Sequence, residues 1–99
     1  MDITNEIIFS VSANDDLEDI YLYVSETLKA IKAADNFLYK FSNNIMRLEE
    51  MPEYCCLYKN SIYRKLIINN YMAIYYYDKK NKIVSILRIV YFRRSFFKI

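Results

Sequence analysis

The sequence predicts an α+β fold with the element order β-α-α-β-β-β, in which a helical hairpin packs on a small, mostly antiparallel sheet. Two observations lead to this expectation. Two amphipathic segments with helical spacing follow a short apolar run, and residues 62–94 then hold runs of β-branched and aromatic residues separated by short polar clusters. Because 99 residues allow only one modest core, we expect a single domain over residues 1–99.

The overall composition is that of a folded protein. Hydrophobic residues make up 55% of the chain and charged residues 26%, a balance typical of folded rather than disordered proteins. No apolar run approaches the roughly 20 residues that a membrane-spanning helix needs. Residues 1–6 lack the basic and apolar regions of a signal peptide. We therefore expect a cytoplasmic protein without a membrane partner.

The first half begins with a short apolar run at residues 6–11, which fits a strand. Residues 12–15, Ser-Ala-Asn-Asp, have the form of a capping box, so we expect the first helix to begin there. Acidic residues crowd its first turn, where the helix dipole favours negative charge: Asp15, Asp16, Glu18 and Asp19. One apolar face follows at helical spacing: Leu17, Ile20, Tyr21, Val24 and Leu28.

A second amphipathic helix precedes Pro52, with Arg47 near its C-terminal end. Its apolar face has the same spacing: Ala34, Phe37, Leu38, Phe41, Ile45 and Leu48. The end of the first helix is not marked, because residues 27–32 contain no Gly or Pro. A single continuous helix of about 36 residues would run roughly 54 Å, too long for a compact domain of this size, so we expect a helical hairpin.

Residues 62–94 are expected to form a meander of about three antiparallel strands. Asn69-Asn70 suits a two-residue turn, because Asn tolerates positive φ better than most residues and the chain has no Gly. Cys55 and Cys56 lie in the long connection before this meander. Adjacent cysteines close only a strained ring, and no His can complete a common zinc site, so we expect reduced thiols, no metal and no cofactor.

Charge is distributed unevenly along the chain. Residues 1–58 carry 4 Lys and Arg against 11 Asp and Glu, whereas residues 59–99 carry 10 against 1, so the halves have net charges of −7 and +9. One interpretation is that the helices carry acids, the strands carry bases, and all of these charges face water. The other is that the strand half offers a basic surface to a phosphate backbone or to an acidic partner.

Several short sequence segments, taken together in their order and spacing, resemble the RelE/ParE toxin superfamily over nearly the whole chain. They are Phe9-Ser10 with Ala13 and residues 16–21, Met51-Pro52-Glu53, residues 63–67, Asn70-Tyr71 leading to residues 74–76, and residues 86–90 leading to Arg93-Arg94. The resemblance implies the toxin of a type II toxin–antitoxin pair, held inactive by a cognate antitoxin. It also implies one of two activities: RelE-like members cut messenger RNA on the ribosome without a metal, and ParE-like members poison DNA gyrase.

One position separates these two activities. Metal-free RNA cleavage needs a proton acceptor, a proton donor and cations that stabilise charge on the phosphate. The resemblance implies that RelE-like enzymes carry a catalytic Arg directly after the Tyr that begins the middle strand. Here Met72 follows Tyr71, and a thioether cannot stabilise an anionic phosphorane. ParE-like members instead tend to have an uncharged residue there, so the chain is expected to be closer to ParE.

Several basic residues remain candidates for function. If the protein is RelE-like, we expect the catalytic residues Lys65, Arg64, Arg88 and Arg93. For target binding in general we expect Arg64, Lys65, Arg88, Tyr91, Arg93 and Arg94. Structural roles fit as well, because Arg64 and Arg88 can pair with helix carboxylates and Tyr91 can fill the edge of the core. No His or well-placed Glu is available as a base, although a Lys with a lowered pKa can serve.

The end of the chain has its own signature. ParE-like members often end in His-Gly-Arg-Arg-Asp, and here Tyr91-Phe92 replaces the His-Gly while Arg93-Arg94 is kept. Chain ends with so many apolar groups are usually docked on their own sheet or on a partner. Our first hypothesis is a ParE-like toxin that inhibits a target such as DNA gyrase. The alternatives are a RelE-like, ribosome-dependent mRNA endonuclease and an inactive nucleic-acid-binding relative.

Overall fold

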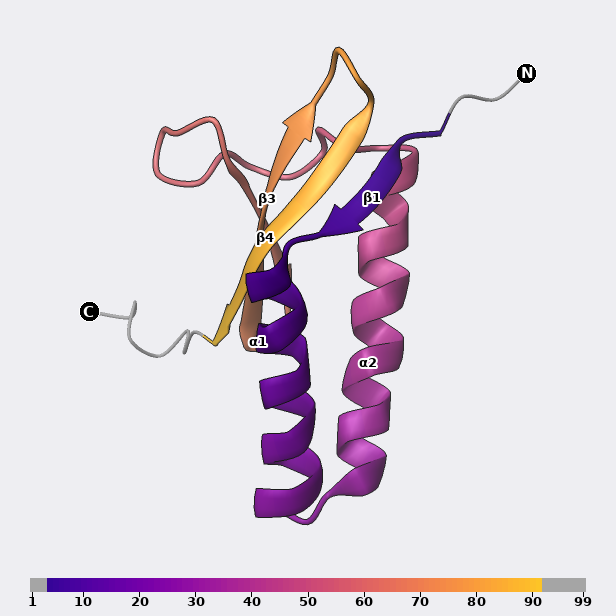
Figure 1. Ribbon diagram of the computed structural model, residues 1–99, viewed down its shortest axis with the longest axis vertical. Helices are drawn as coiled ribbons and strands as arrows, with labels where there is room; N and C mark the ends of the chain where they lie inside the picture. Colours follow the sequence, from indigo (N-terminus) through magenta and orange to yellow (C-terminus); the bar gives the residue numbers. More distant parts are fainter. Residues whose placement is uncertain (1–3, 92–99) are drawn as a thin grey trace.

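A computed structural model of the chain describes residues 4–91, which form two helices packed on one face of a four-stranded sheet (Figure 1). The strands are β1 (Glu6–Phe9), β2 (Arg64–Ile68), β3 (Tyr71–Asp78) and β4 (Ile83–Tyr91). The helices are α1 (Val11–Leu22) and α2 (Ile31–Met46), with a π-helical turn η1 (Tyr23–Thr27) and a 3-10 turn η2 (Arg47–Glu49) after them. The predicted order of elements and the helical hairpin are confirmed.

The sheet has the strand order β1-β4-β3-β2. Strands β2, β3 and β4 form the predicted antiparallel meander, and β1 pairs with β4 in parallel. The pairing of Ile68 with Tyr71 confirms the two-residue Asn69-Asn70 turn, in which Asn69 has a φ of 57°. Between Ile86 and Arg88, β4 carries one residue more than its partner, so a bulge shifts the alternation of its side chains.

Helix α1 begins earlier than the sequence indicates. Strand β1 ends at Phe9, and Ser10 is the N-cap, with its Oγ accepting a hydrogen bond from the Ala13 N–H at 3.0 Å. The expected capping box at residues 12–15 is therefore wrong, and the acidic residues fall beyond the first turn. The physical reason is a tertiary contact: the same Ser10 hydroxyl donates to the Leu87 carbonyl at 2.8 Å, which fixes the start of the helix against β4.

The helical hairpin turns without glycine. After η1, the Leu28 N–H donates to the Tyr23 carbonyl and the Ala30 N–H to the Val24 carbonyl, both at 3.0 Å. Lys29 lies between them with a φ of 53°, the left-handed conformation that closes many helices. Figure 1 shows the tip of this hairpin extending past the end of the sheet.

The core lies between α2 and the sheet. The apolar face predicted for the second helix is largely confirmed: Ala34, Phe37, Phe41, Ile45 and Leu48 are buried, while Leu38 is half-buried. The sheet contributes Leu66, Ile68, Ala73, Tyr75, Val84, Ile86 and Ile89. The face predicted for the first helix is covered less well, because Leu28 near the hairpin tip is 54% exposed. Among residues 4–91, no helix is both long and apolar enough to cross a membrane.

We predict opposite effects of glycine at two exposed lysines. Lys29→Gly removes the steric cost of positive φ and should raise the free energy of unfolding by about 0.5 to 1 kcal/mol. Lys40→Gly, in the middle of α2, should lower it by about 1 kcal/mol, because Gly weakens a helix interior. Urea denaturation of both variants tests this, and a loss of stability in Lys29→Gly would contradict the role of the turn.

Candidate interaction surface

One face of the sheet is not covered by the helices among the residues that the structure describes. We call it the open face; strand alternation and register assign it Glu6, Ile8, Lys65, Ile67, Met72, Ile74, Tyr76, Asp78, Ile83, Ser85, Arg88 and Val90. Most of its side chains are half-buried against their neighbours in the sheet. Its centre is apolar and its charges lie toward the rim.

Met72 lies within the open face, between two aliphatic residues. It pairs with Ile67 of β2 and with Val90 of β4, so three apolar side chains form one row across the sheet. The adjacent row is Lys65, Ile74 and Arg88. The residue at which RelE-like enzymes are expected to carry an arginine therefore lies in an apolar row, one row away from two basic side chains.

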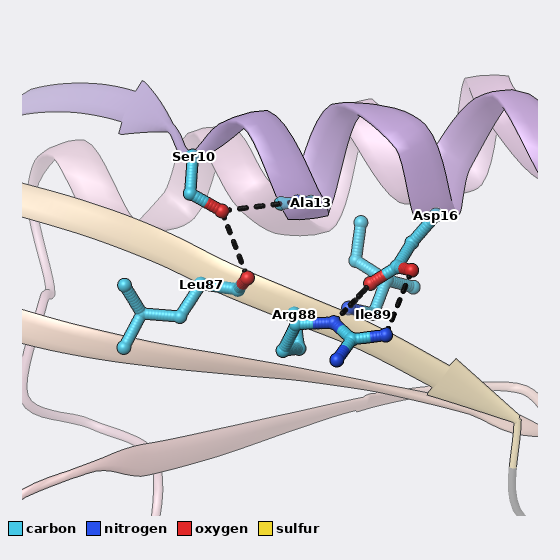
Figure 2. Close-up of polar contacts among 6 residues, drawn as sticks. All are labelled: Ser10, Ala13, Asp16, Leu87, Arg88 and Ile89. Carbon is cyan, nitrogen blue, oxygen red and sulfur yellow. Dashed lines mark hydrogen bonds and ion pairs between the residues drawn. The ribbon is translucent and has the colours of Figure 1, made fainter.

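Arg88 is held by a helix carboxylate, the structural role that the sequence left open. Its Nε donates to Asp16 Oδ2 at 2.8 Å and its second guanidinium nitrogen to Oδ1 at 3.0 Å, a bidentate pair. The Ile89 N–H donates to the same carboxylate at 2.8 Å, and Figure 2 shows Asp16 reaching from α1 toward both residues of β4. Asp16 is only 15% exposed, whereas Arg88 is 55% exposed.

The pKa of Asp16 reports this arrangement. The hydrogen bonds from Arg88 hold the pKa of the Asp16 carboxyl below its ordinary value of 3.8, against the opposing effect of burial, and the Ile89 N–H lowers the pKa further. The carboxylate is therefore fully ionised at neutral pH and serves as a permanent acceptor for the edge of β4.

Arg64 is engaged elsewhere. It begins β2 on the face that the helices cover, where one of its guanidinium nitrogens donates to the Cys55 carbonyl at 2.7 Å and to the Glu53 carbonyl at 3.4 Å. The Glu53 carboxylate is 4.0 Å from the other terminal nitrogen. Arg64 thus ties the connection between η2 and β2 to the sheet, and it does not share a surface with Arg88.

The remaining candidate residues lie in different places. Lys65 is half-buried on the open face, and Tyr91 is exposed at the end of β4. Arg93 and Arg94 lie outside the described residues. Of the four candidate residues that the structure describes, Lys65 and Arg88 share one row of the open face, whereas Arg64 and Tyr91 lie elsewhere.

Both cysteines are free thiols, with Cys55 buried and Cys56 exposed. The Tyr75 hydroxyl near them donates to the Pro52 carbonyl at 2.9 Å, and burial raises the pKa of this hydroxyl far above its usual range. Among residues 4–91, no cluster of three or more His, Cys, Asp or Glu is placed to hold a metal ion.

A groove that sequence reasoning missed lies between the hairpin tip and the end of the sheet. We call it the tip groove; its volume is about 520 Å³, and it is lined by Asp19, Ile20, Tyr23, Val24, Leu28, Tyr71 and Tyr91. Tyr71 and Tyr91 meet edge to face with ring centroids 5.4 Å apart. Burial raises the pKa of the Tyr71 hydroxyl, helped by the nearby Tyr91 and Tyr23 hydroxyls. Tyr23 gave no sequence signal because it falls outside the helical apolar spacing.

The sequence and the fold match known proteins. A family model described as the ParE toxin of type II toxin–antitoxin systems, parDE, matches residues 7–96. A chain of the chromosomal ParDE system from P. aeruginosa is similar, with a TM-score of 0.77 and 17% identity over 93% of this chain and all (100%) of that one. A chain of the RelBE2 toxin–antitoxin complex from Mycobacterium tuberculosis has a TM-score of 0.55 and 16% identity, over 90% and 99%. No curated protein matches the sequence significantly.

We predict that Asp16→Ala lowers the free energy of unfolding by about 2 kcal/mol at pH 7, because Arg88 and the Ile89 N–H lose their acceptor. A lowered folded-state pKa stabilises the fold above the unfolded-state pKa, and that stabilisation is lost as the pH falls through the folded-state value. The difference from the wild type should therefore shrink below about pH 4. The exposed neighbour variant Asp15→Ala should change stability by less than about 0.5 kcal/mol. Thermal denaturation between pH 2 and 7 measures both, and a difference independent of pH would contradict the role of the carboxylate.

Proposed function

This chain belongs to the family of ParE toxins of type II toxin–antitoxin systems, and we propose that it acts by binding and inhibiting a macromolecular target, with DNA gyrase as the first candidate. In this proposal the open face is the working surface and no bond is made or broken. A cognate antitoxin neutralises the toxin by binding it. Action on such a target takes place in the cytoplasm.

The apolar centre of the open face carries the proposal. Ile67, Met72 and Val90 are half-buried and form an apolar row on the face of the sheet opposite the helices. An apolar patch with charges at its rim is typical of a surface that contacts another protein. A nucleic-acid surface would instead be dominated by cations along the phosphate path.

The positions of the arginines support a mode of action without RNA cleavage. An RNA cleavage site needs basic side chains that can contact the scissile phosphate, and a group that accepts the 2′-hydroxyl proton. Arg64 is bonded to backbone carbonyls of the preceding connection, and Arg88 is neutralised by Asp16. Both therefore have structural partners that a phosphate would have to displace.

A second candidate function rests on the row of Lys65, Ile74 and Arg88. These residues place two basic side chains on either side of the middle strand of the meander. Such a pair could hold an RNA backbone if Arg88 left Asp16, which is the arrangement a RelE-like mRNA endonuclease would require. Under this second hypothesis the candidate catalytic residues are Lys65, Arg64, Arg88 and Arg93.

A single substitution separates these two functions. We predict that Met72→Arg weakens growth inhibition by about tenfold or more, because an apolar contact at the centre of the interface is replaced by a charge. The matched control Met46→Arg, on the exposed surface of α2, should remain as toxic as the wild type. Toxicity is measured by plating efficiency after induction in a bacterial host.

The same cultures identify the target class. Plasmid supercoiling and the DNA-damage response should change with induction, while toe-printing of translated messages shows no new cuts. Intact DNA topology together with cuts in the decoding codon would overturn the proposal. An increase of cutting in Met72→Arg would then favour the endonuclease.

The antitoxin proposal has its own test. We predict that the reading frame adjacent to this one encodes a small protein whose co-expression restores growth, and that the two proteins purify as one complex. Size-exclusion chromatography with light scattering gives the stoichiometry. Undiminished toxicity in the presence of the neighbouring product would contradict a paired antitoxin.

A further inference from the structure

The tip groove leaves a large aromatic surface in contact with water among the described residues. Tyr23 and Leu28 on the hairpin side are each 54% exposed, and Tyr91 on the sheet side is 57% exposed. A second hollow of about 630 Å³ adjoins the groove and shares Val24 and Tyr71 with it. We call these two adjoining hollows the channel; their lining residues range from the hairpin tip to the Asn69-Asn70 turn. Surfaces of this kind usually have an occupant.

The last described residue of the chain lies at this channel. Tyr91 is the last described residue, and its ring forms part of the groove wall. Eight residues follow it in the sequence, which we call the tail (residues 92–99). Eight extended residues reach at most about 26 Å, and Tyr91 itself lines the groove, so the tail starts within reach of the other groove residues.

The composition of the tail complements the groove. Its apolar members are Phe92, Phe96, Phe97 and Ile99, and its basic members are Arg93, Arg94 and Lys98. The groove offers aliphatic and tyrosine side chains for the first group. For the second it offers the Asp19 carboxylate and three tyrosine side chains, whose aromatic rings attract cations. The tail has no acidic residue that Asp19 would repel.

We propose that the tip groove is the docking site of the chain's own tail, with the phenylalanines in the apolar channel and a basic side chain at Asp19. Tethering favours this occupant over a separate molecule, because a segment attached at the groove wall has an effective concentration in the millimolar range for a short flexible linker. Docking removes the apolar side chains of the tail and those of the groove wall from water together, which is favourable through the hydrophobic effect. The proposal does not depend on the target of the toxin.

Photo-crosslinking of the full-length protein tests the proposal. We replace Phe96 with p-benzoylphenylalanine, irradiate at low protein concentration, and map the cross-linked peptides by mass spectrometry. Cross-links within one molecule to residues 19–28 or to Tyr71 are expected. The same probe at Tyr39, which is 70% exposed on α2, controls for non-specific capture.

Two matched tip variants complete the design. Leu28→Asp places a charge in the groove wall and should reduce the groove cross-links at least about fivefold. Ile31→Asp, at an exposed apolar position that does not line the groove, should leave them unchanged. Circular dichroism verifies that both variants remain folded.

The outcomes are unambiguous. Intramolecular cross-links that Leu28→Asp removes and Ile31→Asp retains would establish the docked tail. Cross-links that appear only between two molecules would assign the groove to a second copy and overturn the proposal. Cross-links to other regions, or groove cross-links insensitive to Leu28→Asp, would overturn it as well.

Discussion

The exposed edge of β4 is the constraint on which the fold depends. Strand β1 pairs with β4 only as far as Ile86, so the remaining five residues of β4 have no strand on that side within the described chain. The start of α1 takes the place of that strand. The Ser10 N–H and hydroxyl donate to the Ile86 and Leu87 carbonyls, and Asp16 accepts from the Ile89 N–H. The helix therefore sits beside the sheet edge and satisfies backbone groups that would otherwise invite pairing.

Much of the fold follows from local patterns, and its exceptions have physical causes. The spacing that includes Phe37 and Phe41 predicts α2, and Asn69-Asn70 predicts the turn. Both patterns depend on conformational preferences of residues that are close in sequence. The start of α1 was misplaced because Ser10 and Ser12 are both plausible caps, and the choice is made by Leu87, far away in sequence. No local pattern contains that information.

The candidate site was predicted less well for the same reason. The concentration of basic residues after residue 58 suggested one cationic surface, but side-chain direction and partners decide what a charge does. Arg64 and Arg88 lie on different parts of the molecule, each fixed by groups that sequence spacing does not reveal. The bulge in β4 changes which side chains face the helices after Ile86, so simple alternation from one end of the strand fails. The open face has an apolar row at its centre instead of the continuous cationic surface that the charge distribution suggested.

The parallel pairing of β1 with β4 also makes the fold depend on a strand that is synthesised late. The hydrogen bond from Ser10 to Leu87 joins residues 77 apart in the chain, so the first strand is made long before its partner. Until β4 leaves the ribosome, β1 has no neighbour in the sheet and α1 has no edge to satisfy. Long-range pairings of this kind close late, because the entropy of the intervening loop must be overcome first. A nascent or truncated chain that ends before β4 therefore lacks the parallel strand pair and the contacts that Ser10 and Asp16 make with β4.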